Sequence, residues 1–263
     1  MKTYSIQQVL RMDIQYLYKY RTFNDSTERI ILYDEVYVPS PLEFNDPFDC
    51  RVPVIAEGSE EDFKNLIIEE FRSKAPTLSE QEIKKLAEAK LGDGTHKDKT
   101  KIQQALESAI VNQLKNIGVD CLSAKNDDIL MWSHYADGHK GFCLEFEGSD
   151  YKTFLKRANK VNYQKELPII NYFDKNCLPK ILLTKSEQWR YEEEWRIIQV
   201  NGPGKYGIPE GVLSGVIFGC QMPQEHKNKI INWSKGRKVP VRFYQAQIKK
   251  REFGLNIIRL TNL

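Results

Sequence analysis

The sequence predicts an α+β fold in a single domain spanning residues 1–263, with a helical insertion at residues 58–117. Two observations support this prediction. Short segments rich in β-branched and aromatic residues recur along most of the chain, and short helical patterns separate them. Between residues 58 and 117, in contrast, apolar residues recur every three or four positions, as they do in amphipathic helices.

The composition is that of a folded globular protein. Hydrophobic residues make up 41% and charged residues 29% of the 263 positions, which excludes a disordered chain. The net charge of +3 and the isoelectric point near 8.4 are too small to indicate nucleic-acid binding by themselves.

The sequence also predicts a cytoplasmic protein with no membrane partner. Residues 1–13 lack the apolar segment and cleavage pattern of a secretory signal, and no apolar segment is long enough to span a bilayer. The five cysteines are odd in number and contain no CxxC pair, so we expect reduced thiols.

Helices and strands alternate in the N-terminal part of the prediction. Residues 5–12 are predicted to form a short helix, residues 16–21 (YLYKYR) a strand, residues 24–32 a capped turn of helix and residues 36–38 an extended segment. A proline-containing loop follows at residues 40–50. Its phenylalanines indicate a loop that packs on the core and fixes its polar side chains.

Three helices are predicted in the insertion, at residues 60–73, 79–91 and 101–117, with a break at Gly92–Gly94. The charged residues there are expected to form a solvated surface, with partner recognition as the alternative.

The rest of the chain returns to strands. A helix after Asp127 or Asp128 is predicted to extend through Tyr135, and a second one covers residues 223–234. Residues 168–183 are predicted to be mostly helical. Strands are predicted at residues 119–123, 141–146, 160–163, 194–200, 212–218, 239–247 and 255–260.

The segment KSEQWRYEEEWR at residues 185–196 is predicted to be an exposed turn that leads into a strand. Strand alternation would place Glu192, Glu194 and Arg196 on one face. Two carboxylates on neighbouring positions of a face repel each other unless Arg196 or a hydrogen-bonding sugar hydroxyl lies between them. The alternative is a half-buried strand whose charges form salt bridges.

Other kinds of site have weaker support. The spacing of His134, His139 and Cys143 matches no zinc pattern, and we expect no resident metal. Cys121 and Cys143 lie in apolar strands, where a thiol is normally unreactive. An acidic metal cluster of the nuclease type remains an alternative. It would use Asp46, Asp49, Glu192 and Glu194, with Lys19 or Lys185 assisting.

A strand that ends in Ser123 precedes a helix that presents Trp132 and Tyr135 on nearly one face. These rings could line a pocket for a flat aromatic ligand, or they could simply pack in the core.

Several segments together resemble a bacterial family known as domain of unknown function 2971. The resemblance covers nearly the whole chain outside the insertion and implies no activity. The matching segments are LYKYR at 17–21, FNDPFD at 44–49, CLS at 121–123, LMWSHYADGHKGFCLEF at 130–146 and WxxExEWR at 189–196.

The order of these segments is also similar to that of the ADP-ribosyltransferases. This similarity implies sheets of ADP-ribosyltransferase-like type and transfer of ADP-ribose from NAD to a nucleic-acid or protein acceptor. It implies that Glu194 holds the ribose 2′-hydroxyl and stabilises the positive charge on the sugar as nicotinamide departs. Glu192 would orient or deprotonate the acceptor.

The same similarity implies a set of NAD-binding residues. Lys19 and Arg21 of the first strand would contact the ribose or pyrophosphate, and the residue that matches the family's Arg or His is Lys19, Tyr20 or Arg21. Ser123, Trp132 and Tyr135 would brace the helix and stack on nicotinamide. The other expected pocket residues are Asn45, Asp46, His134, His139 and Arg196.

The leading hypothesis is therefore a cytoplasmic, NAD-dependent ADP-ribosyltransferase-like enzyme of catalytic α+β type. A role as a toxin or phage-defence effector would add an antitoxin or regulatory partner. The alternatives are a metal-dependent nuclease, which chelation would inactivate, and a non-catalytic binding module. In the module, Glu194→Gln would change stability and little else, whereas a catalytic Glu194 predicts lost turnover without lost stability.

Overall fold

The computed structural model describes residues 15–94, 97–148 and 154–261. The helix predicted at residues 5–12 lies outside the described residues. The chain divides into two compact units made of discontinuous segments. Unit 1 comprises Met1–Pro39, Gly118–Val161 and Glu187–Leu263, and unit 2 comprises Ser40–Ile117 and Asn162–Ser186.

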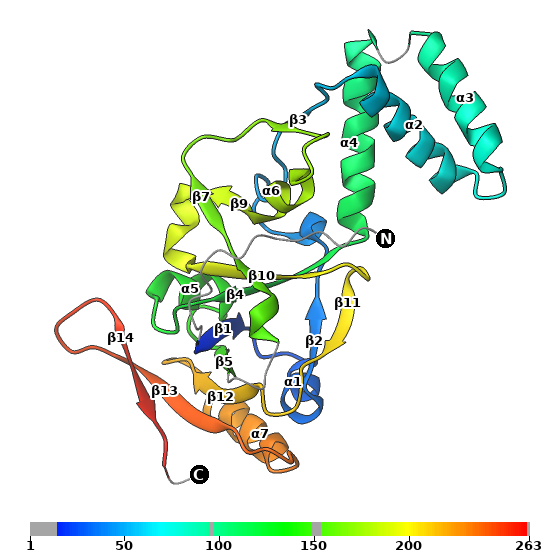
Figure 1. Cartoon of the computed structure of the whole chain (residues 1–263). Coiled ribbons are helices and arrows are strands. Elements are labelled where there is room, and N and C mark those ends of the chain that lie inside the picture. The colour runs from blue at the N-terminus through cyan, green and yellow to red at the C-terminus, as the bar shows by residue number, and fades with distance from the viewer. Residues whose placement is uncertain (1–14, 95–96, 149–153, 262–263) are drawn as a thin grey trace. The chain divides into compact units, whose positions relative to one another are not determined.

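Unit 1 is built on an eight-stranded sheet with the order β14-β13-β12-β5-β1-β4-β10-β6 (Figure 1). Only β12 and β13 pair in parallel, and all other neighbours in this sheet pair in antiparallel fashion. The predicted mixture of helices with a mostly antiparallel sheet is therefore confirmed. The strands are β1 (Tyr16–Arg21), β4 (Gly118–Ser123), β5 (Phe142–Glu147), β6 (Ala158–Lys160), β10 (Glu194–Gln199), β12 (Leu213–Phe218), β13 (Arg242–Ile248) and β14 (Leu255–Arg259).

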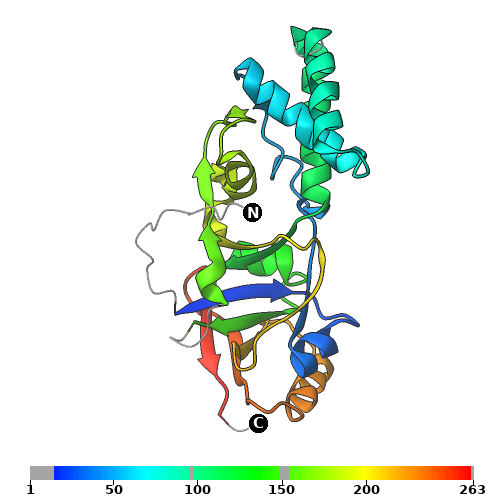
Figure 2. The same ribbon diagram turned by 45° about the vertical axis from the view of Figure 1, so that its right-hand side comes forward.

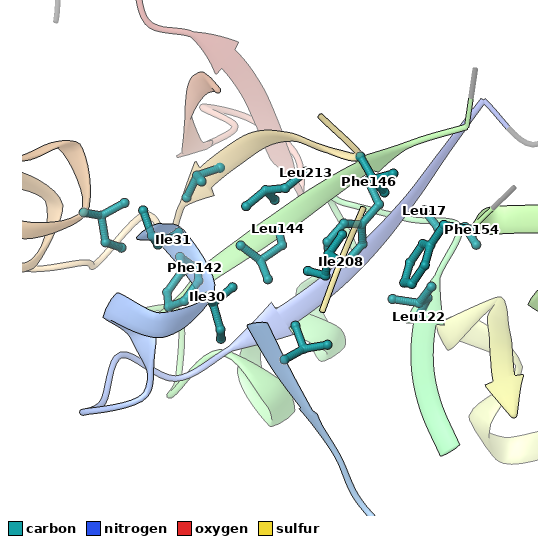
Figure 3. Packing of buried hydrophobic residues seen from close by; sticks show 14 of the residues in the cluster. Leu17, Ile30, Ile31, Leu122, Phe142, Leu144, Phe146, Phe154, Ile208 and Leu213 are labelled. Carbon is teal, nitrogen blue, oxygen red and sulfur yellow. The ribbon is translucent and has the colours of Figure 1, made fainter. Parts of the chain in front are cut away.

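Apolar cores form on both faces of this sheet because side chains alternate along each strand. Leu17 of β1 belongs to one core, which also contains Ile30 of α1 (Thr27–Tyr33) and Ile230 of α7 (Gln224–Ser234). Figure 3 shows part of this core packed around β1 and β5. Tyr18 belongs to the other core, on which α5 (Ile129–Tyr135) packs. We call these two sides the leucine face and the tyrosine face.

Short elements complete unit 1. β2 (Glu35–Val38) pairs with β11 (Gly204–Gly207), and the 3-10 helices η3 (Leu155–Arg157) and η4 (Glu187–Glu192) precede β6 and β10. Helix α5 begins as predicted, because the Asp128 carboxylate accepts hydrogen bonds from the backbone NH groups of Leu130 and Met131.

Unit 2 contains the three predicted helices, α2 (Glu60–Lys74), α3 (Glu80–Gly92) and α4 (Lys99–Lys115) (Figure 2). Ser59 and Ser79 form capping boxes at the starts of α2 and α3, and the Asp98 side chain caps α4. The remaining elements of unit 2 are η1 (Pro41–Glu43), β3 (Val54–Ile55), β7 (Asn162–Gln164), β8 (Ile170–Asn171), α6 (Cys177–Leu183) and β9 (Thr184–Ser186).

Two predicted elements differ from the structure. The helix predicted at residues 168–183 is confined to α6, because Ile170 pairs with Val54 in a sheet and the Asn171 side chain accepts a hydrogen bond from the backbone of Phe173. The strand predicted at residues 160–163 divides at Val161 into β6 and β7, which pair with different strands. In the described part of the chain, no helix has the length and apolar character that a bilayer span requires.

Gly219 permits a close backbone approach after β12. A Cβ atom at this position would lie 2.1 Å from the carbonyl oxygen of His139, and the Gly219 NH donates to the carbonyl of Gly141. We expect Gly219→Ala to lower the free energy of unfolding by about 2 kcal/mol, measured by urea denaturation. Gly207→Ala is the control, because nothing lies within 4 Å of its added Cβ. Equal urea midpoints for the two variants would contradict the prediction.

Candidate active site

A row of polar side chains crosses three neighbouring strands of unit 1. Tyr18 of β1 pairs with Ser123 of β4, and Ser123 pairs with Glu194 of β10. Directly paired residues in antiparallel strands project to the same face of a sheet. Tyr18, Ser123 and Glu194 therefore share the tyrosine face, on which α5 packs.

Glu194 forms a bidentate ion pair with Arg196, two residues further along the same strand. The Arg196 Nε and Nη2 atoms lie 2.7 and 3.1 Å from the two Glu194 carboxylate oxygens. Arg196 is 0% exposed and Glu194 is 3% exposed. The Cys121 thiol also hydrogen-bonds the Glu194 side chain, and burial with this neighbouring carboxylate raises the pKa of Cys121 well above its usual range. The Glu194 carboxylate is thus held in one orientation.

Glu192 is positioned by the end of β4 and by α5. The Ser123 hydroxyl donates to the Glu192 carbonyl at 2.5 Å, and the Tyr135 hydroxyl donates to the Glu192 carboxylate at 2.7 Å. The exposed turn predicted here is wrong for Glu192, which is only 3% exposed. The alternation of the strand does not include Glu192. Glu192 is the last residue of η4, and Glu193, which separates it from β10, has a left-handed φ of 42°.

Four aromatic side chains form a cluster that contacts Glu192 through Tyr135. The His134 ring centroid is 6.2 Å from the Tyr135 and Trp189 rings and 6.4 Å from the Tyr191 ring, and the Trp189 and Tyr191 centroids are 6.0 Å apart. His134 is exposed and the other three are partly exposed. We call His134, Tyr135, Trp189 and Tyr191 the aromatic group. Tyr135 links it to Glu192.

The segment that contains these residues matches a family model. The model is described as "Protein of unknown function (DUF2971)" and matches residues 131–197. This match confirms the predicted family resemblance. The matched residues extend from α5 to the middle of β10. No curated protein and no solved structure matches the chain.

Lys19 and Arg21 of β1 do not face Glu194. They share the leucine face with Leu17, on the opposite side of the sheet from Tyr18 and Ser123. The Lys19 ammonium group donates to Asp120 at 2.5 Å and to the Cys121 carbonyl at 3.2 Å. The predicted contact of both basic residues with NAD beside Glu194 is therefore corrected.

Trp132 and Tyr20 are on the tyrosine face but are core residues. Trp132 is fully buried, meets Tyr20 edge to face at 5.2 Å and donates its indole NH to the Asn126 carbonyl. Tyr20 donates its hydroxyl to the Lys125 carbonyl, and burial raises the pKa of Tyr20 far above its usual value. The predicted stacking of Trp132 on nicotinamide is wrong because no part of its ring is exposed. Tyr135 of α5, in contrast, keeps a partly exposed ring.

His139 belongs to unit 1, whereas Asn45 and Asp46 belong to unit 2. His139 has a left-handed φ of 69° and stacks over Trp132; its Nδ1 atom is buried without a hydrogen-bond partner in the described part of the chain, and burial lowers its pKa. Asp46 accepts a hydrogen bond from the backbone of Phe48.

Unit 2 also contains a buried ion pair between Asp49 and Lys185, with a nitrogen–oxygen distance of 3.7 Å. Among the described residues, no group of three or more His, Cys, Asp or Glu side chains is arranged to hold a metal ion.

Sequence reasoning missed Tyr18 and Tyr191. The signal for Tyr18 was present, because the alternation in YLYKYR places its three tyrosines on one face and groups Lys19 with the apolar Leu17. Tyr191 gave no comparable signal, since its neighbour His134 comes from α5, far away in sequence.

Proposed function

We propose that this protein is an NAD-dependent ADP-ribosyltransferase-like enzyme whose reaction centre is formed by Glu192, Glu194 and the aromatic group. The observation that carries this proposal is the fixed pair of buried carboxylates next to partly exposed aromatic rings in one unit. On this proposal the eight-stranded sheet is of ADP-ribosyltransferase-like type, and the acceptor is a nucleic acid or a protein.

The aromatic group suits the reacting end of NAD. The nicotinamide ring of NAD is flat and positively charged, so both aromatic faces and carboxylates attract it. Tyr135, Trp189 and Tyr191 expose part of their rings, and Tyr135 contacts the Glu192 carboxylate directly. A cationic ring that lies on this group would therefore be close to a buried negative charge.

Each carboxylate has a distinct role in the proposed reaction. Glu194, oriented by Arg196 and Cys121, stabilises the positive charge that develops on the sugar when its bond to nicotinamide breaks. Glu192 accepts the proton of the acceptor nucleophile. Ser123 and Tyr135 act as positioning residues, because their hydroxyl groups hold the Glu192 backbone and carboxylate.

The proposed biological setting is cytoplasmic, as a toxin or phage-defence effector with an antitoxin or regulatory partner.

The proposal predicts that nicotinamide release from NAD falls at least about 100-fold in Glu192→Gln and in Glu194→Gln. Release is measured with and without EDTA, in the presence of cell RNA and protein extract. Glu193→Gln is the matched control, since this carboxylate lies between the two, is partly exposed and pairs with Lys125 at 3.2 Å. Release should be unchanged by EDTA and by the control substitution.

Absence of nicotinamide release from the folded wild-type protein would contradict the proposal. Nucleic-acid cleavage that EDTA abolishes would instead favour the nuclease hypothesis.

The non-catalytic module is the second candidate, because the buried Glu194–Arg196 ion pair could equally have a purely structural role. Wild-type protein that stays folded and binds NAD without cleaving it would favour this candidate.

A further inference from the structure

The C-terminal part of the chain differs sharply in charge from the rest. Residues 221–263 contain ten Lys or Arg residues and two Asp or Glu residues, a local net charge of +8. Because the whole chain has a net charge of +3, residues 1–220 carry a net charge of −5. Such asymmetry is typical of a chain with one surface for a polyanionic partner.

Some of these cations have structural partners. Arg237 pairs with Asp34 at 2.8 Å, and Arg242 contacts Glu145 and Glu147. Several others are exposed and form no ion pair with another described residue. They are Lys238, Lys250, Arg251 and Arg259.

The connection between β13 and β14 presents an aromatic ring among these cations. Phe253 is 101% exposed, and its loop also contains Lys250, Arg251 and the ion pair between Lys249 and Glu252 at 3.4 Å. Figure 1 shows this connection extending from the edge of the sheet formed by β14. Both faces of the Phe253 ring are therefore accessible, so that it can stack on a base.

The strands next to the loop carry exposed amide side chains. Gln247 of β13 pairs with Asn256 of β14, so both side chains lie on the same face of the hairpin, and both are exposed. Amides hydrogen-bond readily to nucleobase edges.

We infer that the β13–β14 hairpin, with its loop at residues 249–254, binds single-stranded nucleic acid. Lys250 and Arg251 contact phosphates, Phe253 stacks on a base, and Gln247 and Asn256 meet base edges. An anionic membrane would also attract the cations and the ring, but the exposed amide pair would gain nothing from a lipid surface. The inference depends on charge and exposure in residues 221–263 and not on the proposed NAD chemistry.

The test is fluorescence anisotropy with a labelled oligouridylate of about 10 nucleotides and no NAD, over a series of salt concentrations. Phe253→Ala should weaken binding about tenfold, because one base–aromatic stack is lost. Phe253→Trp should restore it. Since Phe253 is completely exposed, both variants should unfold at the wild-type temperature.

The cations are tested by Lys250→Ala/Arg251→Ala. Loss of two phosphate contacts should reduce the slope of log affinity against log salt by about 1.4. Lys84→Ala/Lys85→Ala, which removes two exposed cations from α3, is the matched control and should leave binding unchanged.

Equal losses in the two double variants would overturn the inference, as would wild-type affinity in Phe253→Ala. Tighter binding to the matching duplex would exclude base stacking. Binding only to vesicles that contain phosphatidylserine would show that the partner of the hairpin is an anionic membrane and not a nucleic acid.

Discussion

Glu194→Gln is expected to lower the free energy of unfolding by about 3 kcal/mol. The substitution keeps the shape of the side chain but removes the charge that faces Arg196, which is 0% exposed. The buried guanidinium group of Arg196 then loses its bidentate carboxylate partner and faces a neutral amide, which is a weaker acceptor for a cation. Urea denaturation of the wild type and the variant measures the difference. Glu193→Gln provides the control, because the Glu193 side chain is partly exposed and its removal leaves no buried charge.

A double-mutant cycle separates the ion pair from other contacts. Arg196→Met should also destabilise, because it leaves the Glu194 carboxylate buried without its cation. Glu194→Gln/Arg196→Met should be more stable than the sum of the single effects predicts, since both charges of the pair are removed together. Strict additivity would mean that the two groups do not interact as their 2.7 Å contact indicates.

The expected loss of stability in Glu194→Gln changes how the enzyme hypothesis and the binding-module hypothesis can be distinguished. The sequence suggested that a catalytic Glu194 could be replaced without loss of stability, whereas a structural one could not. Because Arg196 depends on Glu194 in either case, Glu194→Gln should be destabilised under both hypotheses. Turnover must therefore be measured at a temperature and urea concentration at which the variant is folded. Glu192→Gln is the more informative variant, since the Tyr135 hydroxyl can still donate to the new amide oxygen.

Local patterns were sufficient for most of the fold. The helices of unit 2 were predictable because Ser59 and Ser79 each precede an acidic residue by three positions, which defines both helix starts. The strands of unit 1 were predictable from their β-branched and aromatic residues. The segment at residues 168–171 was missed because its structure depends on pairing with Val54, more than one hundred residues away in sequence.

The candidate site was predictable only in part, because it depends on register. Alternation grouped Glu194 with Arg196 correctly, but the left-handed conformation of Glu193 removed Glu192 from that pattern. Its burial follows from contacts with Ser123 and Tyr135, which no local pattern encodes. Similarly, Trp132 was a reasonable stacking residue in sequence, and only the packing of α5 against Tyr20 shows that its ring is enclosed.

Lys19→Met is expected to lower the free energy of unfolding by about 3 kcal/mol. Lys19 and Asp120 form a buried ion pair at 2.5 Å, with side-chain exposures of 9% and 2%. Without Lys19, the Asp120 carboxylate is left buried beside apolar residues of the leucine face. Lys19→Met/Asp120→Leu should recover part of the loss, because it removes both charges and keeps apolar volume. Thermal or urea denaturation of the three variants measures the effect.

The same variants test which face of β1 belongs to the proposed site. Because Lys19 projects away from Tyr18 and Ser123, Lys19→Met/Asp120→Leu should cleave NAD with the wild-type KM once the fraction of folded protein is taken into account. A direct contact between Lys19 and the pyrophosphate would instead raise KM without loss of stability. That outcome would require β1 to be shifted by one residue relative to β4, since a single-residue shift exchanges the two faces of a strand. In that register, the side chains of Lys19 and Arg21 would share a face of the sheet with Glu194, and the three tyrosines would project from the opposite face.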